Sequence, residues 1–237
     1  MVAIRNLQIL PMIFVIGSIL IPLLEIQGAG RMSEASSKEG KIKLPEPRFE
    51  SPVSIEEVLF KRRSIRRYKD KNLKLSEISQ LLWAAQGITD KKRGLRTAPS
   101  AGALYPLEVY LAVGNVSGVP FGIYKYKPRN HEIVKIKEGD LRSEISRAAL
   151  RQSCVEKGAV DIIIVGVYKR TTQKYGERGF RYVHMEAGHV AQNVYLQAVA
   201  LGLGTVVVGA FQDEMLKKVL NMPDGEFPLY IMPVGRK

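Results

Sequence analysis

The chain of 237 residues is long enough to bury a sizeable core, as one domain of ordinary size with an extra segment. Its 46% hydrophobic and 25% charged residues are typical of a globular protein and exclude a largely disordered one. The lone cysteine, Cys154, excludes an internal disulfide framework and cannot form a structural zinc site by itself; we expect a small, partly buried residue. The net charge of +13 favours an anionic partner, but the basic residues are spread along the chain without a nucleic-acid-binding motif. We therefore expect one anionic cofactor or a solvated surface, and no nucleic acid.

The N-terminal segment is almost uncharged over residues 7–26, a length that could cross a bilayer. Arg5 precedes this run, as in a signal sequence, and the small residues 28–30 form a poor cleavage site. Residues 1–31 are therefore predicted to be a signal or anchor, with membrane association through residues 7–26. The alternative is that translation starts at Met32, which would give a cytoplasmic protein without this segment.

Two helices are predicted after a linker at residues 32–53, which is rich in Ser, Lys, Glu and Pro. Ser54 and Glu57 have the spacing of a capping box, so a short helix is expected to begin there. A second helix is predicted from Ser76 to the stop at Gly87. Its apolar residues at helical spacing are Ile78, Leu81, Leu82 and Ala85.

The remainder of the chain alternates between strand and helix patterns without strict β-α-β order. A nearly continuous apolar run at residues 159–168 predicts a strand covered on both faces. The class is therefore α+β, a sheet with helices packed on it. The other predicted elements are a strand at 107–113, a hairpin around 128–130, a helix at 141–152, a helix at 182–201, a strand at 205–211, a helix at 213–220 and a strand at 228–235.

A dense basic segment at residues 61–67 follows the first predicted helix. Guanidinium groups and a hydroxyl at this density suit a phosphate, which accepts charge-assisted hydrogen bonds. Taken alone, the segment is better explained as a solvated basic turn.

Three further segments offer something to an anion or a flat ring. The loop 98–106 has small residues that let the backbone approach a planar ligand, and Tyr105 could border it. Residues 202–211 carry glycines before and after a predicted strand, without the spacing of a dinucleotide fingerprint. Arg236 and Lys237 end the chain with two cations. Each of these segments has an ordinary structural explanation, a tight loop or a strand end.

A metal site is not expected in the helix at 182–201. His184 and His189 are five residues apart, so they diverge around the helix axis, unlike the i, i+4 pair of a zinc helix. We interpret this helix, which also contains Glu186, as a packed interface.

Taken together and in this order, the four segments resemble the nitroreductase-like FMN oxidoreductases. The likeness runs from about Val53 to Lys237, and the loop sequence PSAGALYP resembles the branch of azoline-oxidising (SagB-type) dehydrogenases. The resemblance implies a nitroreductase-like fold with a central, mostly antiparallel sheet flanked by helices. It also implies an FMN-binding domain at 54–237 and a homodimer with FMN at the subunit interface.

The resemblance also implies roles for individual residues. Arg62, Arg63 and Ser64 would hold the FMN phosphate and ribityl chain, and Arg66 would lie at the pyrimidine edge of the ring. The loop residues that would approach the flavin of the partner subunit are Pro99, Ser100, Ala101 and Gly102. The backbone N–H groups that would meet flavin N5 and O4 belong to Gly209 and Ala210. The C-terminal phosphate contacts would be Arg236 and Lys237.

The activity implied is hydride transfer through flavin N5 between a reduced donor, expected to be NAD(P)H, and a small organic acceptor. No catalytic residue is required, although Tyr105 is a candidate proton donor or stacking residue. Where members typical of quinone and nitroaromatic reduction carry Asn and Gln-Pro, this chain has residues 103–106, ALYP, which leaves the acceptor open. The alternative function is a non-catalytic flavin-binding or sensor module tethered to a membrane.

Overall fold

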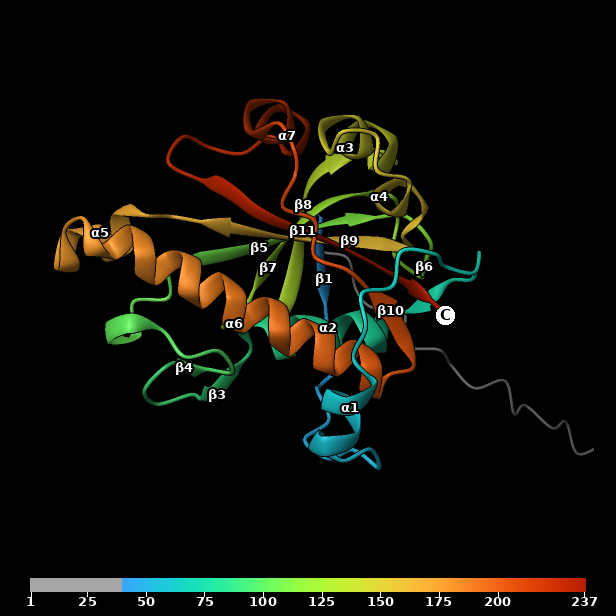
Figure 1. Ribbon diagram of the computed structural model, residues 1–237, viewed down its shortest axis with the longest axis horizontal. Coiled ribbons are helices and arrows are strands. Elements are labelled where there is room, and N and C mark those ends of the chain that lie inside the picture. Colours follow the sequence, from blue (N-terminus) through green and yellow to red (C-terminus); the bar gives the residue numbers. More distant parts are fainter. Residues whose placement is uncertain (1–39) are drawn as a thin grey trace, which may run out of the picture. The chain divides into compact units, whose positions relative to one another are not determined.

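The computed structural model describes residues 40–237, and its centre is a seven-stranded sheet (Figure 1). The elements in chain order are β1 (Lys41–Lys43), α1 (Ile55–Lys61), β2 (Leu73–Lys74), α2 (Leu75–Gln86), β3 (Ile88–Asp90), β4 (Leu95–Arg96), the 3₁₀ turn η1 (Ala101–Ala103), β5 (Leu107–Val113), β6 (Val116–Ser117), β7 (Gly122–Lys127), β8 (Glu132–Glu138), α3 (Arg142–Ala148), α4 (Ser153–Lys157), β9 (Val160–Gly166), α5 (Lys169–Tyr175), α6 (Arg178–Ala200), β10 (Leu203–Thr205), α7 (Asp213–Leu220) and β11 (Phe227–Arg236). The sheet order is β1-β8-β7-β5-β9-β11-β10, and every neighbouring pair is antiparallel. The predicted α+β class with a mostly antiparallel sheet is confirmed.

Helices cover both faces of the sheet, which explains why its central strands are apolar throughout. In β5, Leu111 packs with α2 and α6, whereas the neighbouring Tyr110 packs with α3 and α7. In β9, Ile162 and Ile163 divide between the same two clusters. Figure 1 shows α2 and α6 on one side of the sheet and α3, α4 and α7 on the other. A strand covered on both faces must be apolar at every position, as predicted for β9.

The first two helices begin and end close to the predicted residues. The Ser54 side chain accepts a hydrogen bond from the backbone N–H of Glu57 at 3.2 Å, so it caps α1 as expected. Helix α2 begins one residue before the predicted Ser76. There the carboxylate of Glu77 accepts the backbone N–H of Lys74 at 2.8 Å. Gly87 ends α2 as predicted.

Two elements differ from the prediction. The helix expected at 141–152 is shortened to α3, because Leu150 and Arg151 have φ angles of +56° and +58°, outside the helical region; the separate helix α4 begins only after the predicted range. The strand expected at 205–211 is reduced to β10 and one isolated bridge between Val208 and Ile231. The backbone N–H of Val207 donates to the hydroxyl of Tyr195 instead of to a neighbouring strand.

Part of the predicted linker, residues 40–53, is ordered against the domain. Strand β1 pairs with β8, and Leu44 is buried in the core. Further along, the backbone N–H of Arg48 donates to Oε1 of Gln80 on α2 at 2.8 Å. Alternating residues in β1 do not distinguish such a short edge strand from an extended linker, because it contains only three residues.

The expected membrane localisation is corrected by the structure. Within residues 40–237, no helix combines the length and the apolar character needed to cross a bilayer. The segments 1–31 and 7–26 and the alternative start at Met32 lie outside the described residues.

Candidate active site

Residues 62–67 of the basic segment lie against β10, the strand at one edge of the sheet. The backbone N–H of Ile65 donates to the carbonyl oxygen of Thr205 at 2.9 Å. Gly204 allows this approach, because a Cβ atom there would lie 2.7 Å from Cγ2 of Ile65. The glycine before the predicted strand therefore has a packing role: it brings the basic segment onto the sheet.

Tyr195 of α6 joins the basic segment to the chain that follows β10. Its hydroxyl lies 3.0 Å from Oγ of Ser64 and accepts the backbone N–H of Val207 at 2.8 Å. The guanidinium of Arg62 lies over its ring, 5.2 Å from the centroid. A cation at this distance from a ring is attracted by the negative face of its π-system. Arg62 and Ser64, two predicted phosphate ligands, are thus brought together on one tyrosine.

Two other predicted phosphate ligands already have acceptors within the chain. The guanidinium of Arg63 donates to the carbonyl oxygens of Phe60 at 2.9 Å and Arg62 at 2.7 Å. Arg236 donates through both terminal nitrogens to the carboxylate of Glu77, each at 2.8 Å. This bidentate pair fastens the end of β11 to the start of α2. To bind phosphate, either guanidinium would have to share or leave these acceptors.

Four predicted residues remain open to a ligand. Arg66 and Lys237 are exposed, and their side chains make no hydrogen bond or ion pair within residues 40–237. Gly209 and Ala210 are also exposed, and their backbone N–H groups have no acceptor in that part of the chain. Only the carbonyl oxygen of Ala210 is engaged, by the side chain of Gln152 at 3.0 Å. These two amides can therefore donate to an added polar edge.

The predicted partner-facing loop is a tightly wound turn. Oγ of Ser100 accepts the backbone N–H of Tyr105 at 2.8 Å. Gly102 has a φ of +62°, and Ala103 and Tyr105 also have positive φ angles, of +53° and +46°. Non-glycine residues in this region are strained, and such strain persists only where surrounding contacts hold it. The loop is therefore preorganised.

Tyr105 and three other polar residues form a chain of contacts beneath this loop. The hydroxyl of Tyr105 accepts the backbone N–H of Arg96 at 3.1 Å, and the Arg96 guanidinium lies 4.6 Å from the ring centroid. Arg96 then donates to Oε1 of Gln86 at 2.8 Å, and Gln86 donates to Oε1 of Glu186 at 3.2 Å. Burial raises the pKa of Glu186. The Tyr105 hydroxyl thus accepts one hydrogen bond, from Arg96 of β4, and keeps its own proton to donate.

The predicted site residues fall into two groups on one chain. The loop residues border a cavity of about 270 Å³, whose lining consists of Pro99, Ser100, Ala101, Tyr182, Met185, Glu186 and His189. Arg62 and Ser64 instead contact Tyr195, which lies nine residues beyond Glu186 on α6. Nine helical residues span about 13 Å along the axis. The chain therefore does not assemble the loop and the basic segment into one site by itself.

Three residues at the site were missed by the sequence analysis. Tyr195 could not be distinguished from an ordinary interface residue of a long helix. Lys174 and Tyr175 end the short helix α5 against the loop: a Cβ atom on Gly102 would lie 2.6 Å from the Tyr175 hydroxyl and 3.0 Å from Nζ of Lys174. An adjacent lysine and tyrosine carry no sequence signal, and only their position beside the loop draws attention to them.

Known proteins resemble this chain over most of its length. The model of the nitroreductase family matches residues 59–236. A protein of Methanocaldococcus jannaschii described as a candidate nitroreductase is 53% identical over 185 residues, 78% of this chain and 92% of that protein. A crystal structure from Ralstonia eutropha, also described as a candidate nitroreductase, has a TM-score of 0.73 at 29% identity, covering 85% of this chain and 91% of its own.

A third relative belongs to a peptide-processing complex. A chain of the Escherichia coli microcin synthetase complex, solved with a truncated microcin precursor bound, has a TM-score of 0.64 at 25% identity. The match covers 82% of this chain and 77% of that one. The family model spans most of the chain, and the M. jannaschii protein is matched over nearly its whole length. The chain therefore belongs to the nitroreductase family of oxidoreductases.

Proposed function

We propose that this protein is an FMN-dependent oxidoreductase that transfers hydride between NAD(P)H and a small organic substrate. The observation that carries the proposal is that one side chain, Tyr195, contacts two of the segments with binding chemistry. Its hydroxyl lies 3.0 Å from Oγ of Ser64 and accepts the backbone N–H of Val207, and Arg62 lies over its ring. On these same two segments, Arg66 and the amides of Gly209 and Ala210 are exposed. Cations suit a phosphate, and free N–H donors suit the polar edge of a flavin ring.

The residues present fit FMN, with a division of tasks among them. Arg62 and Ser64 would hold the phosphate and ribityl chain, while Arg63 and Arg236 would reach the phosphate only by sharing their present acceptors. Arg66 would place a positive charge beside the ring. Bound flavin would supply two-electron hydride transfer at N5, with the protein providing position and charge.

A homodimer would complete the site. The loop 99–102 and the basic segment are separated along α6, so each flavin would be held by the basic segment of one chain and the loop of its partner. The loop is wound and strained before any ligand binds, which is typical of a preformed binding edge.

Lys174 and Tyr175 have titratable side chains beside Gly102 of this loop, and we assign them to proton transfer. Both polar ends lie within contact distance of the space beside Gly102. A lysine ammonium and a phenol can each donate a proton to a substrate atom, and their conjugate bases, an amine and a phenolate, can each accept one. The hydroxyl of Tyr105, in contrast, is already engaged as the acceptor of the backbone N–H of Arg96.

Residues 103–106 bear on the choice of substrate. The sequence ALYP departs from the pattern of quinone- and nitroaromatic-reducing members, and a relative sits in a complex that binds a microcin precursor. The substrate set to test therefore includes quinones, nitroaromatics and azoline peptides, the last as hydride donors rather than acceptors.

The experiment uses purified protein loaded with FMN. Under argon, NAD(P)H is expected to bleach the flavin absorbance, and addition of an acceptor to restore it over many turnovers. A protein that binds FMN but is reduced neither by the two nucleotides nor by azoline peptides would instead be a binding module. A protein that takes up no FMN would contradict the proposal altogether.

A further inference from the structure

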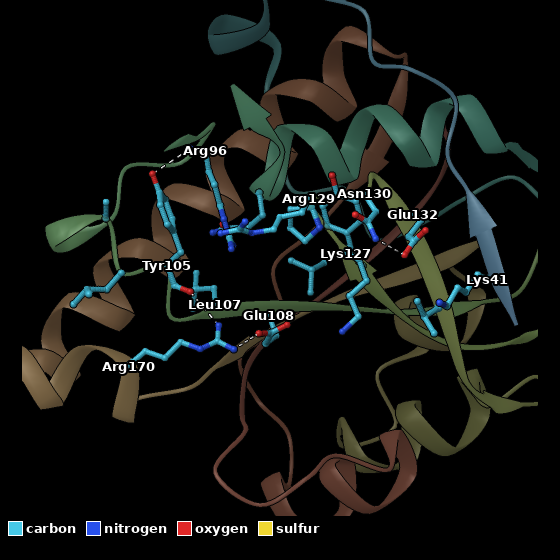
Figure 2. A pocket seen from close by; sticks show the side chains of 17 residues that line it. Lys41, Arg96, Tyr105, Leu107, Glu108, Lys127, Arg129, Asn130, Glu132 and Arg170 are labelled. Carbon is cyan, nitrogen blue, oxygen red and sulfur yellow. Dashed lines mark hydrogen bonds and ion pairs between the residues drawn. The ribbon is translucent and has the colours of Figure 1, made fainter. Parts of the chain in front are cut away.

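A second, larger cavity lies between the loop 95–105, the β7–β8 hairpin and α5 (Figure 2). Its volume is about 770 Å³, within the range of sites for small organic ligands. None of the residues assigned to the flavin lines this cavity. It shares Ala103, Leu104 and Tyr105 with the loop 98–106.

The lining of this cavity has an excess of positive charge. Its five cationic side chains are Lys41, Arg96, Lys127, Arg129 and Arg170, and its two acidic side chains are Glu108 and Glu132. Both carboxylates are already engaged. Glu108 pairs with Arg170 and with Lys125, which lies 3.5 Å away behind the lining, and Glu132 accepts from Asn130 at 3.0 Å. With both carboxylates counted against the five cations, the lining keeps a net charge of +3.

Arg96 is the fixed cation of the cavity. Its Nη1 donates to Gln86, its guanidinium stacks on Tyr105, and its buried Nε has no acceptor within residues 40–237. Burial lowers the pKa of Arg96, although the charges of Glu108 and Glu186 oppose this. Two contacts therefore orient the guanidinium. One of its nitrogens still lacks an acceptor in the described part of the chain.

Arg129 is a second cation of the cavity and lies in the turn between β7 and β8. Figure 2 shows the side chains of Arg96 and Arg129 extending toward one another from different walls of the cavity. Arg129 is exposed and makes no hydrogen bond or ion pair within the described residues. Two guanidinium groups directed at the same space repel one another unless an anion lies between them.

We propose that this cavity binds the oxyanion group, phosphate or carboxylate, of a small organic molecule between Arg96 and Arg129. Planar guanidinium forks match both kinds of oxyanion. The apolar residues Leu104, Leu107, Val109 and Val134 line the same cavity and can cover the uncharged body of the molecule.

The position of the cavity suggests why such a molecule would bind there. Ala103 and Tyr105 belong both to its lining and to the loop that, in the proposed dimer, approaches the partner's flavin. An oxyanion-bearing substrate, either the nucleotide donor or a carboxylate acceptor, would be anchored here. This last step rests on the proposed function, whereas binding itself does not.

The test is calorimetric titration of FMN-saturated protein at low ionic strength with pyrophosphate and, separately, with citrate. Saturation with FMN keeps both probes out of the flavin phosphate site. Arg129→Gln is expected to weaken binding by at least about tenfold, because one charged hydrogen-bonding group is removed. The matched control is Arg147→Gln on α3. Arg147 is exposed, and its ion-pair partner within residues 40–237 is Glu144. This variant should bind both probes as tightly as the parent does.

The two probes separate the sources of the oxyanion: tighter binding of pyrophosphate assigns a phosphate, and tighter binding of citrate assigns a carboxylate. The proposal is overturned if neither probe binds, if Arg129→Gln binds as tightly as the parent, or if Arg147→Gln loses as much. Binding that depends on Arg129 in a protein that takes up no FMN would support this site and contradict only the proposed function.

Discussion

At the scale of single residues, Tyr195 organises the flavin side of the proposed site. One hydroxyl contacts Ser64 and accepts the N–H of Val207, while the ring supports Arg62. The same hydrogen bond withdraws Val207 from the sheet and so leads the chain toward the exposed Gly209. A residue on a long helix thereby sets the positions of two distant segments that carry the binding groups.

Replacing Arg62 tests the phosphate assignment. Arg62→Ala removes one charge-assisted hydrogen bond, worth about 1.5–3 kcal/mol, so the dissociation constant of FMN should rise roughly 10- to 150-fold. Fluorescence titration of the apoprotein with FMN measures this. Arg147→Ala removes the same charge at an exposed residue outside the proposed phosphate contacts and should leave FMN affinity unchanged. Equal affinities for Arg62→Ala and the parent would show that the phosphate binds elsewhere.

Asp161 makes stability depend on pH. It is 0% exposed, and neither carboxylate oxygen has a hydrogen-bond partner within residues 40–237. Burial therefore raises its pKa well above the ordinary value, although the charge of Arg142 opposes this. Since the folded state holds the proton more tightly than the unfolded state, the free energy of unfolding falls as the pH rises from about 4 through the folded pKa.

Asp161→Asn removes this titration and should stabilise the protein increasingly with pH. Urea unfolding is measured at about pH 4, where Asp161 is protonated in the folded state and about half protonated in the unfolded state, and at about pH 8. The gain over the parent is expected to be larger at the higher pH. Asp224→Asn, at an exposed position, should show no such trend. A gain that is independent of pH would mean that Asp161 is not neutral in the folded state.

At the scale of elements, α2 illustrates which stabilising interactions were visible in the sequence. Ile78, Leu81 and Leu82 recur at helical spacing, and all three are buried against the sheet. The helix also carries Glu77, whose carboxylate both caps its first turn and holds Arg236. The apolar face was predicted from periodicity, but the second task of Glu77 was not, because Arg236 lies 159 residues away.

Two substitutions compare packing with capping. Leu81→Ala, at a side chain that is 0% exposed, should lower the free energy of unfolding by about 2–5 kcal/mol. Ser54→Ala removes only the cap of α1 and should cost about 1 kcal/mol. Urea denaturation with an unchanged m-value measures both. If the cap cost as much as the core leucine, α1 would have to be more tightly coupled to the core than its largely exposed face indicates.

At the scale of the whole molecule, the separation of the two groups of site residues is the central feature. The loop 99–102 lies near Glu186, and the basic segment lies near Tyr195. Both contacts are made by the rigid helix α6, so a small rearrangement of one chain cannot join them. A two-fold dimer can join them, because it can place the loop of each chain opposite the basic segment of the other chain.

Subunit mixing tests this arrangement. A variant with Arg62→Ala and Arg66→Ala and a second with Gly102→Val should each be nearly inactive, the latter because valine would overlap Tyr175 at a positive φ. Co-expressed in equal amounts, about half of the dimers are mixed, and each mixed dimer has one intact site, giving about a quarter of parental activity. Simple mixing of the two folded proteins without subunit exchange is the control and should remain inactive. Persistent inactivity after exchange would place both segments in the same chain's site.

The sequence by itself determined the class of the fold, most of its helices and strands, and the four segments with binding chemistry. These features depend on local periodicity, capping and residue type, which act over a few neighbouring residues. Whether Arg66 is open while Arg236 is paired, whether Val207 continues a strand, and whether the loop meets the basic segment were decided by the tertiary structure. Each of these outcomes depends on a contact between residues far apart in sequence, such as Arg236 with Glu77 or Val207 with Tyr195, and no local pattern specifies such a pairing.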